Sequence, residues 1–269
     1  MSPPPLAPAA ARWHGLPPAL ARLGVALRSY ALFAAAWWAL SAWVDNPLQL
    51  PDPLRVARAL IQLVRDGEVL EHASVSTGRL LLSLAVAAIV AVPLGFVVGL
   101  SRQVEAFVDP LVELLRPISG IAWIPLALFI FGVGNTLPVF IMVYVAFFPL
   151  LLNTVAGVRS VDARLLAAAR TMGISRAATL RHVVVPSALP MVLVGLRLAF
   201  AGAWAAVVAA ELIGSPSGLG FAIEWYRGLL MSHKVFAFIA VIGVVGFVCD
   251  ALLRALQRRL TPWVEGNGS

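Results

Sequence analysis

The charged residues inside apolar runs are the first candidates for chemistry in this sequence. Arg197 and Glu211 lie in one run, fourteen residues apart, which on a helix separates them by about 21 Å along the axis and leaves them on roughly the same side. Charged side chains are costly in hydrocarbon, so that side must face protein or water. We interpret Glu211 as a structural anchor near the outer face and Arg197 as a group that pairs at the inner boundary. The alternative for Arg197 is that it attracts an anionic solute.

Residues typical of enzymes are not arranged for catalysis. Glu105, Asp109 and Glu113 diverge along one predicted helix, so they indicate a solvated face rather than a metal site. Cys249 is the only cysteine, which excludes an intrachain disulfide and a cysteine-built metal centre. Lys234, the only lysine, follows no glycine loop, so a Walker-type phosphate loop is missing. We therefore expect no catalytic residue, no cofactor and no metal, and energy for any transport must come from another chain.

The composition indicates an integral membrane protein. Of the 269 residues, 61% are hydrophobic and only 12% are charged, and the mean hydropathy is +0.91. A soluble domain carries about a quarter charged residues. The net charge of +7 is explained by arginine-rich cytoplasmic loops. We expect membrane lipid around the chain and no nucleic acid as a partner.

Apolar runs predict an all-α polytopic protein with six transmembrane helices. The spans are expected at 25–44, 80–100, a broken run within 116–135, 137–157, 191–214 and 235–253. Around them we divide the chain into a disordered cytoplasmic tail (1–24), the first span with an outer amphipathic segment (25–72), the core (73–257) and a cytoplasmic C-terminal tail (258–269). The bias of arginine places both termini in the cytoplasm.

The third run is interrupted by proline and glycine and is short for a full span. Broken helices at membrane depth occur where backbone lines a cavity or is buried in protein. Ser119 to Phe131 is therefore our first choice for a segment that lines a solute path. The candidate pathway residues are Ser119, Trp123, Pro125, Asn153, Arg197 and Glu211.

Residues 158–190 form a polar, arginine-rich segment between two apolar runs. Leu165, Leu166 and Ala169 share one side of a short amphipathic helix. Gly173 then permits a chain reversal. We expect a second short helix from Ser175 to about His182, and we expect Pro186 to end it. A water-facing helix, turn and helix between two spans is a good docking surface for a partner protein.

This segment resembles the cytoplasmic loop of ATP-binding-cassette import permeases. The family pattern is E-A-A, three residues, G, nine residues, I-x-L-P. Ala168, Ala169, Gly173 and Pro186 match it, and Ala167 stands where the family has glutamate. The stretches WIPLALFIFGVGNTLPVF and GLRLAFAGAWAAVVAAELIGSPSGLGF also look like the permeases for taurine, alkanesulfonates and nitrate. By this resemblance the residues that couple to the ATPase are Asp162, Ala167, Ala168, Ala169, Gly173 and Pro186.

The resemblance implies a type I ABC importer permease fold in the bacterial inner membrane. It further implies a homodimer, two ATP-binding cassette ATPase subunits on the loops and a periplasmic substrate-binding protein above. The function expected from it is import of a small organosulfonate, taurine or an alkanesulfonate, by alternating access. The same machinery importing nitrate, bicarbonate or a pyrimidine or thiamine precursor is an alternative. An alternative of another class is a self-sufficient secondary transporter, against which the docking loop argues.

Overall fold

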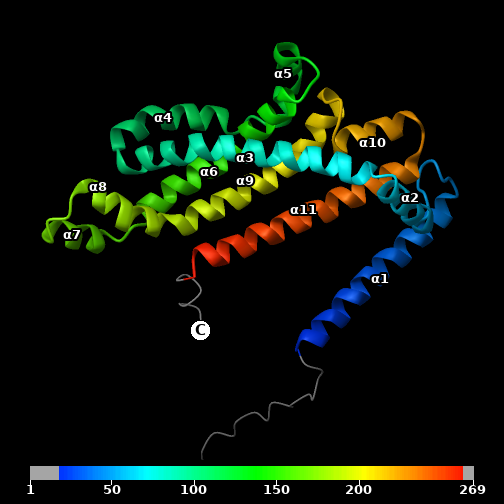
Figure 1. The fold of residues 1–269 in the computed structure, drawn as a ribbon, viewed down its shortest axis with the longest axis horizontal. Helices are drawn as coiled ribbons and strands as arrows, with labels where there is room; N and C mark the ends of the chain where they lie inside the picture. The colour runs from blue at the N-terminus through cyan, green and yellow to red at the C-terminus, as the bar shows by residue number, and fades with distance from the viewer. Residues whose placement is uncertain (1–17, 263–269) are drawn as a thin grey trace, which may run out of the picture.

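A computed structural model describes the chain from residue 18 to residue 262, with side chains described from residue 27 onward. The predicted tail 1–24 thus lies mostly outside the described residues, as does much of the tail 258–269. The described part consists of helices joined by short connections (Figure 1). In chain order they are α1 (Pro18–Val44), α2 (Pro53–Arg65), α3 (Glu68–Leu100), α4 (Arg102–Leu115), the 3₁₀ turn η1 (Gly120–Trp123), α5 (Ile124–Phe131), α6 (Thr136–Arg159), α7 (Ala163–Thr171), α8 (Arg176–Thr179), the π-helical turn η2 (Leu180–Val184), α9 (Val185–Gly214), α10 (Leu219–Gly228) and α11 (Ser232–Leu260).

Helices α3, α6 and α9 form the centre of the bundle. Their contact faces carry small residues, which let the backbones approach closely as is common between membrane helices. A Cβ added at Gly95 of α3 would lie 2.6 Å from the Thr154 Cβ of α6. A Cβ added at Gly195 of α9 would lie 2.7 Å from the Asn153 Cβ. Thr154 and Asn153, which are neighbours on α6, thus each pack against a glycine, one on α3 and one on α9. These close contacts set the spacing of the three helices.

A second cluster packs α2, α10 and α11 together at one end of the bundle (Figure 1). Val56, Ala59 and Leu63 are the buried residues of α2, and they meet Leu219 and Phe238. The amphipathic helix predicted after the first span is therefore present. Its packing holds α10 and the start of α11 beside the start of α3.

The structure has fewer clear spans than the six that the sequence predicts. Among the described residues, four helices are long and apolar enough to cross a membrane: α3, α6, the continuous helix Arg176–Gly214, and α11. A fifth arises if α4 and the segment Gly120–Phe131, which are bent by 81° at their junction, form one span. The count of six is not exact, because the third apolar run is too short to span alone and meets α4 at a sharp bend, and because α1 is not among the qualifying helices.

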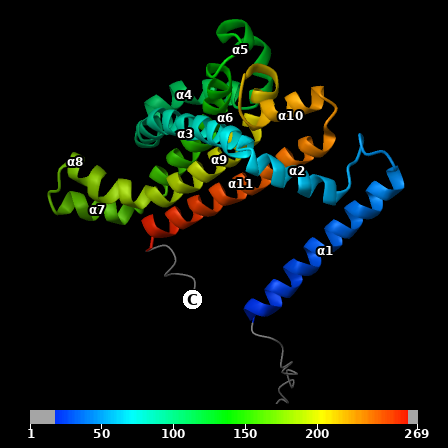
Figure 2. The same ribbon diagram turned by 45° about the vertical axis from the view of Figure 1, so that its right-hand side comes forward.

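Helix α1 lies away from the rest of the bundle in two views that differ by 45° (Figures 1 and 2). It contains the predicted first span. Its described link to the core is made by Trp37, which packs against Phe236 and donates a hydrogen bond from Nε1 to the Pro51 carbonyl at 3.2 Å. Trp38 and Trp43 of α1 are exposed on the protomer.

Pro186 does not end the second helix of the loop, contrary to the sequence expectation. Helix α9 begins at Val185 and carries Pro186 in its first turn, where a missing N–H is tolerated. The preceding turn is π-helical, and the Val185 N–H bonds to the Leu180 carbonyl five residues earlier. Because this wider turn accommodates the ring, the helix runs on from Arg176 to Gly214 over 39 residues.

Candidate functional site

The arginine-rich loop is closed by well-formed helix caps. Asp162 is the N-cap of α7, and its side chain accepts a hydrogen bond from the Arg164 N–H at 2.8 Å. At the other end Gly173 adopts φ +69°, in the left-handed region. The Ile174 N–H reaches the Ala169 carbonyl and the Gly173 N–H reaches the Arg170 carbonyl, both at 3.0 Å. These two bonds form a Schellman motif, so the chain reversal expected at Gly173 is present.

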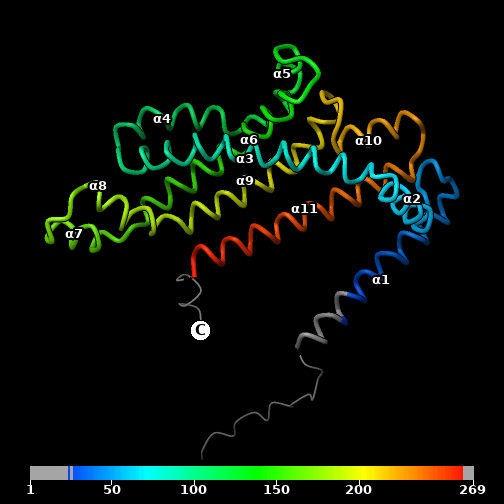
Figure 3. The backbone as a smooth tube through the Cα atoms, viewed as in Figure 1, coloured from blue at the N-terminus to red at the C-terminus, as the bar shows by residue number. Residues whose placement is uncertain are grey.

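The loop presents a basic and partly apolar surface to the outside. Four large apolar side chains are exposed there: Leu165, Met172, Ile174 and Leu180. They are surrounded by exposed arginines, namely Arg164, Arg170, Arg176 and Arg181. The smooth trace in Figure 3 places α7 and α8 at the end of the bundle opposite α2 and α10. We call the exposed residues 162–181 the loop surface.

An apolar junction fixes the loop surface to the bundle. Val158 and Val161, at the end of α6, pack with Val184 and Ala188, at the start of α9. Ala169 is buried, whereas Ala167 and Ala168 are exposed on the loop surface. The loop is therefore in direct packing contact with the segments that end α6 and begin α9.

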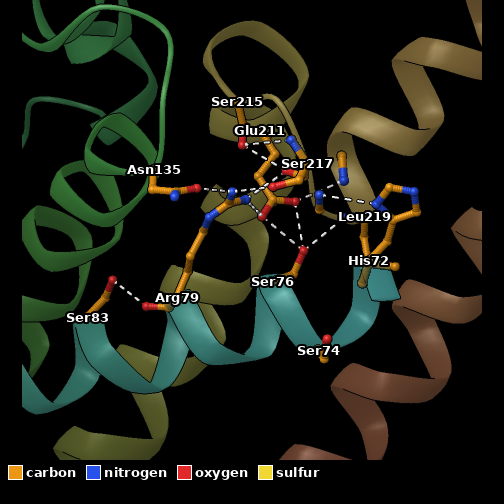
Figure 4. Close-up of polar contacts among 12 residues, drawn as sticks. His72, Ser74, Ser76, Arg79, Ser83, Asn135, Glu211, Ser215, Ser217 and Leu219 are labelled. Carbon is orange, nitrogen blue, oxygen red and sulfur yellow. Dashed lines mark hydrogen bonds and ion pairs between the residues drawn. The ribbon is translucent and has the colours of Figure 1, made fainter. Parts of the chain in front are cut away.

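The largest buried polar cluster lies at the other end of α9, around Glu211 (Figure 4). Its carboxylate is fully buried and accepts hydrogen bonds from the Arg79 Nη1 at 2.6 Å, the Ser76 hydroxyl at 2.8 Å and the Gly220 N–H at 3.0 Å. Arg79 of α3 is only 6% exposed. We call this group the Glu211 cluster.

The Glu211 cluster fastens the connection between α9 and α10. Arg79 also donates to the Ser217 carbonyl at 2.7 Å, the Ser217 hydroxyl at 2.8 Å and the Asn135 side-chain oxygen at 2.5 Å. The Ser76 hydroxyl oxygen accepts from the Leu219 N–H at 2.8 Å. One buried ion pair thus binds α3, α9, the start of α10 and the start of α6 together. Both oxygens of the Glu211 carboxylate accept hydrogen bonds within the protomer.

Arg197 lies at the opposite half of α9 and faces α11. Its Nε donates to Asp250 Oδ1 at 2.8 Å. Arg254 forms an ion pair with the same carboxylate, with its Nη1 3.1 Å from Asp250 Oδ2. The Arg197 side chain remains 43% exposed. Although Arg197 and Glu211 share α9, they are bound by different neighbouring helices.

The remaining pathway candidates are spread over α6 and the bent segment. Ser119 precedes η1 and is exposed, and Pro125 starts α5. The Trp123 ring is tilted by 58° against the Tyr144 ring, with centroids 5.5 Å apart. Within the described residues, the buried Nε1 of Trp123 has no hydrogen-bond partner. Asn153 donates to the Pro149 carbonyl of its own helix at 2.8 Å. A single protomer does not bring these side chains and Arg197 around one opening.

Sequence reasoning missed the partners of both charged residues on α9. Arg79 received no role from the sequence, and it lies inside the long helix α3. Arginine within an apolar helix is itself a signal that a buried carboxylate is near. Asp250 gave the same kind of signal in the last apolar run. Pairing either with its partner requires the fold, since Arg79 and Glu211 are 132 residues apart in sequence.

Sequence comparison relates most of the chain to permeases. The family described as "Binding-protein-dependent transport system inner membrane component" matches residues 91–262. The taurine transport system permease protein TauC of Escherichia coli (strain K12) is 36% identical over 258 residues, which cover 94% of this chain and 92% of that protein. The putative aliphatic sulfonates transport permease protein SsuC of Bacillus subtilis (strain 168) is 33% identical over 234 residues, covering 87% and 85%.

The fold is also similar to a solved transporter. A structure of inward-facing conformations of the MetNI methionine ABC transporter superposes with a TM-score of 0.54 at 17% identity. The match covers 67% of this chain and 92% of that one.

Proposed function

Since the chain belongs to the family of inner membrane components of binding-protein-dependent transport systems, we propose that it carries small organosulfonates inward as the permease of an ABC importer. The relatives named for taurine and for aliphatic sulfonates, each matched over most of its length, support this substrate class. The chain is not an enzyme. Its family implies an ATPase and a substrate-binding protein as partners.

The loop surface is the observation that carries the proposal. Exposed Leu165 and Met172, ringed by arginines, make an amphipathic patch of the kind that docks a partner protein. We assign the contact with the ATPase to α7 and the turn at Gly173, with Asp162 and Pro186 holding the geometry of the two helices. Ala168 offers a small exposed residue that allows close approach. Ala167 contributes no charge, so the arginines carry the electrostatic part of the contact.

The proposed assembly is a homodimer of permeases with two ATPase subunits and one periplasmic binding protein. The loop surface then faces the cytoplasm, α2 and α10 face the periplasm, and both termini are cytoplasmic. Because a single protomer does not enclose an opening, the path is proposed to form between two copies. Ser119, Trp123 and Pro125 line it on one side.

The inner part of the proposed path is formed by α6 and α9. Asn153 and Arg197 line it there. In this proposal Glu211 does not contact the solute, because both oxygens of its carboxylate already accept hydrogen bonds within the protomer. It acts as a buried anchor that holds the helices beside the path.

The test is ATP-driven uptake of a sulfonate by the permease with its ATPase and binding protein in vesicles. Gly173→Leu forces a side chain into the left-handed region, at about 1–2 kcal/mol, and distorts the loop surface. We expect this variant to reach the membrane in normal amounts but to lose ATPase pull-down and uptake.

Gly67→Leu is the matched control, because Gly67 has φ +83° with open space around it at the opposite end of the protein. It should carry the same backbone strain and keep both activities. Normal ATPase pull-down and uptake in Gly173→Leu would reject the role assigned to the loop.

A further inference from the structure

A cavity of about 430 Å³ lies between α3, α4 and α6, which run beside one another in Figure 1. Its lining consists of apolar side chains from these three helices, together with the ring of Tyr144. We propose that this cavity holds one acyl chain of a membrane phospholipid, and that the phosphate of the same lipid binds to Arg102 and Arg159 beyond the end of the cavity. The inference goes beyond the proposed function, on which it rests only for the leaflet that supplies the lipid.

Helix α4 is attached to α6 at its two ends, and the cavity separates the two helices between these points. Near the start of α4, Glu105 forms an ion pair with Arg159 at the end of α6. At the end of α4, the Leu115 carbonyl accepts a hydrogen bond from the Tyr144 hydroxyl of α6 at 2.6 Å. The main helix contact of α4 is with α3. The space between α4 and α6 is therefore left for a ligand.

The contents of this cavity must be apolar. A water in a protein interior needs two to four polar partners, and among the described residues the Tyr144 hydroxyl is the one polar group that a lining side chain offers. Val90 and Leu111 both line the cavity and are each 53% exposed, so it is open at the surface of the protomer. Because α3 and α6 are long enough to cross the membrane, this opening lies at the level of the hydrocarbon.

The length of the cavity matches one leaflet of the bilayer. Its lining on α6 runs from Phe140 to Leu151, which corresponds to about 16 Å of helix. The hydrocarbon core is about 30 Å thick, so each leaflet contributes about 15 Å. An acyl chain that lies along α6 therefore occupies the cavity over the full depth of its leaflet.

A second cavity, of about 500 Å³ and with a basic lining, lies between the same three helices towards the loop surface. It is lined by Gly99, Leu100, Arg102, Glu105 and Arg159. Gly99 is about 8 Å further along α3 than Leu94, which lines the apolar cavity. The two cavities thus follow one another at the spacing of a lipid tail and its headgroup.

The charged groups of the second cavity suit a phosphate. Glu105 offsets the charge of Arg159. Arg102 is exposed and, within the described residues, makes no hydrogen bond or ion pair. The charged lining residues therefore leave one net positive charge, and Asp109 lies one turn further along α4, outside this lining. Guanidinium groups bind phosphate through several N–H donors at once.

The pairing of the two cavities favours a phospholipid over a second copy of the chain. An apolar helix of another protomer would cover the apolar cavity but would leave Arg102 without an anion. Arg159 ends α6 directly before the loop surface. In the proposed assembly the phosphate therefore lies at the cytoplasmic boundary, and the lipid belongs to the inner leaflet.

Photolabelling of the delipidated permease–ATPase complex in a phosphate-free detergent tests the assignment. The probe is a phosphatidylglycerol that carries a diazirine on one acyl chain, and the labelled peptides are identified by mass spectrometry. We expect labels within residues 87–94, 108–115 and 140–151. Val143→Trp fills the cavity and should abolish these labels. Val244→Trp, at a 63% exposed position of α11, is the matched control and should leave them unchanged.

The basic end is tested separately. Arg102→Gln should raise the probe concentration that gives half-maximal labelling about tenfold, because a hydrogen bond to a charged group is lost. Arg116→Gln removes an exposed arginine at the other end of α4 and should have no effect. A diazirine fatty acid that has no phosphate should label these segments more weakly than the phospholipid. Equal labelling by the two probes, or no effect of Arg102→Gln, overturns the assignment.

Leu111→Cys in a Cys249→Ala background tests whether a second copy covers the cavity. A disulfide-linked permease dimer that excludes the probe from the cavity overturns the assignment. ATP-driven sulfonate uptake by the wild-type complex with its binding protein is measured in parallel. Uptake by a complex whose cavity is not labelled overturns this inference alone, whereas labelling without sulfonate uptake overturns the proposed function alone.

Discussion

Removing the Glu211 carboxylate is expected to destabilise the protein more than any single surface change. Glu211→Ala leaves the Arg79 charge, 6% exposed, without its counter-ion, and it also leaves the Ser76 hydroxyl and the Gly220 N–H without their acceptor. Breaking a buried ion pair by removing one partner costs about 3–5 kcal/mol. For a chain of this size that corresponds to a fall of roughly 10 °C in the unfolding midpoint.

The double variant separates an uncompensated charge from lost packing. Arg79→Leu combined with Glu211→Leu removes both charges and keeps apolar volume, so we expect it to be more stable than Glu211→Ala. Glu224→Gln is the control, because Glu224 pairs with Arg227 at 2.5 Å on an exposed part of α10. A surface pair of this kind is worth about 1 kcal/mol or less.

The assay is thermal unfolding of the purified permease, followed by the loss of its monodisperse peak in size-exclusion chromatography. We expect wild type and Glu224→Gln to share the highest unfolding midpoint. The double leucine variant should have a lower midpoint, and Glu211→Ala the lowest. If Glu211→Ala unfolds at the same temperature as Glu224→Gln, the Glu211 cluster does not stabilise its end of the bundle. If the double variant is no better than Glu211→Ala, the loss is one of packing and not of charge.

Two further outcomes follow from contacts elsewhere. At Gly157 a Cβ alone would lie 2.9 Å from both the Ala188 carbonyl oxygen and the Met191 Cβ. We expect Gly157→Leu to lower the free energy of unfolding by about 1–3 kcal/mol. The measurement is the amount of the variant in the membrane, which should fall. Burial first, and then the Glu68 carboxylate that accepts its hydrogen bond, raise the pKa of Tyr226 above its ordinary value of 10.0. The stability from this contact should therefore be fully present below pH 10 and be lost as pH rises through the raised pKa. Between pH 7 and 9, the unfolding midpoint of wild type should exceed that of Tyr226→Phe by a constant amount. A difference in midpoint that changes within that window contradicts the reasoning.

Local chemistry made much of the loop predictable. The amphipathic period of α7 and the glycine at its end are signals confined to a dozen residues, and both the helix and the reversal are present. The Asp162 cap was not predicted. The helical class and most spans followed from the long apolar runs, because hydrocarbon requires every backbone group to be bonded within a helix.

Contacts between distant segments could not be predicted in the same way. Nothing in the spacing of residues pairs Arg79 with Glu211 or Arg197 with Asp250, since each pair joins two helices whose rotation is set by packing. Pro186 was misjudged for a related reason: the wide turn before it absorbs the ring, and a π-helical turn has no clear sequence signature. The count of spans was inexact because the bend between α4 and α5 depends on its neighbours.

The uninterrupted helix from Arg176 to Gly214 has a mechanical consequence. Its 39 residues measure about 58 Å, nearly twice the thickness of the hydrocarbon core. One end of this helix adjoins the loop surface and the other end carries Glu211. A rotation about its middle therefore moves the two ends in opposite directions. In the proposed assembly, a small tilt at the end that contacts the ATPase would therefore displace the Glu211 end in the opposite direction.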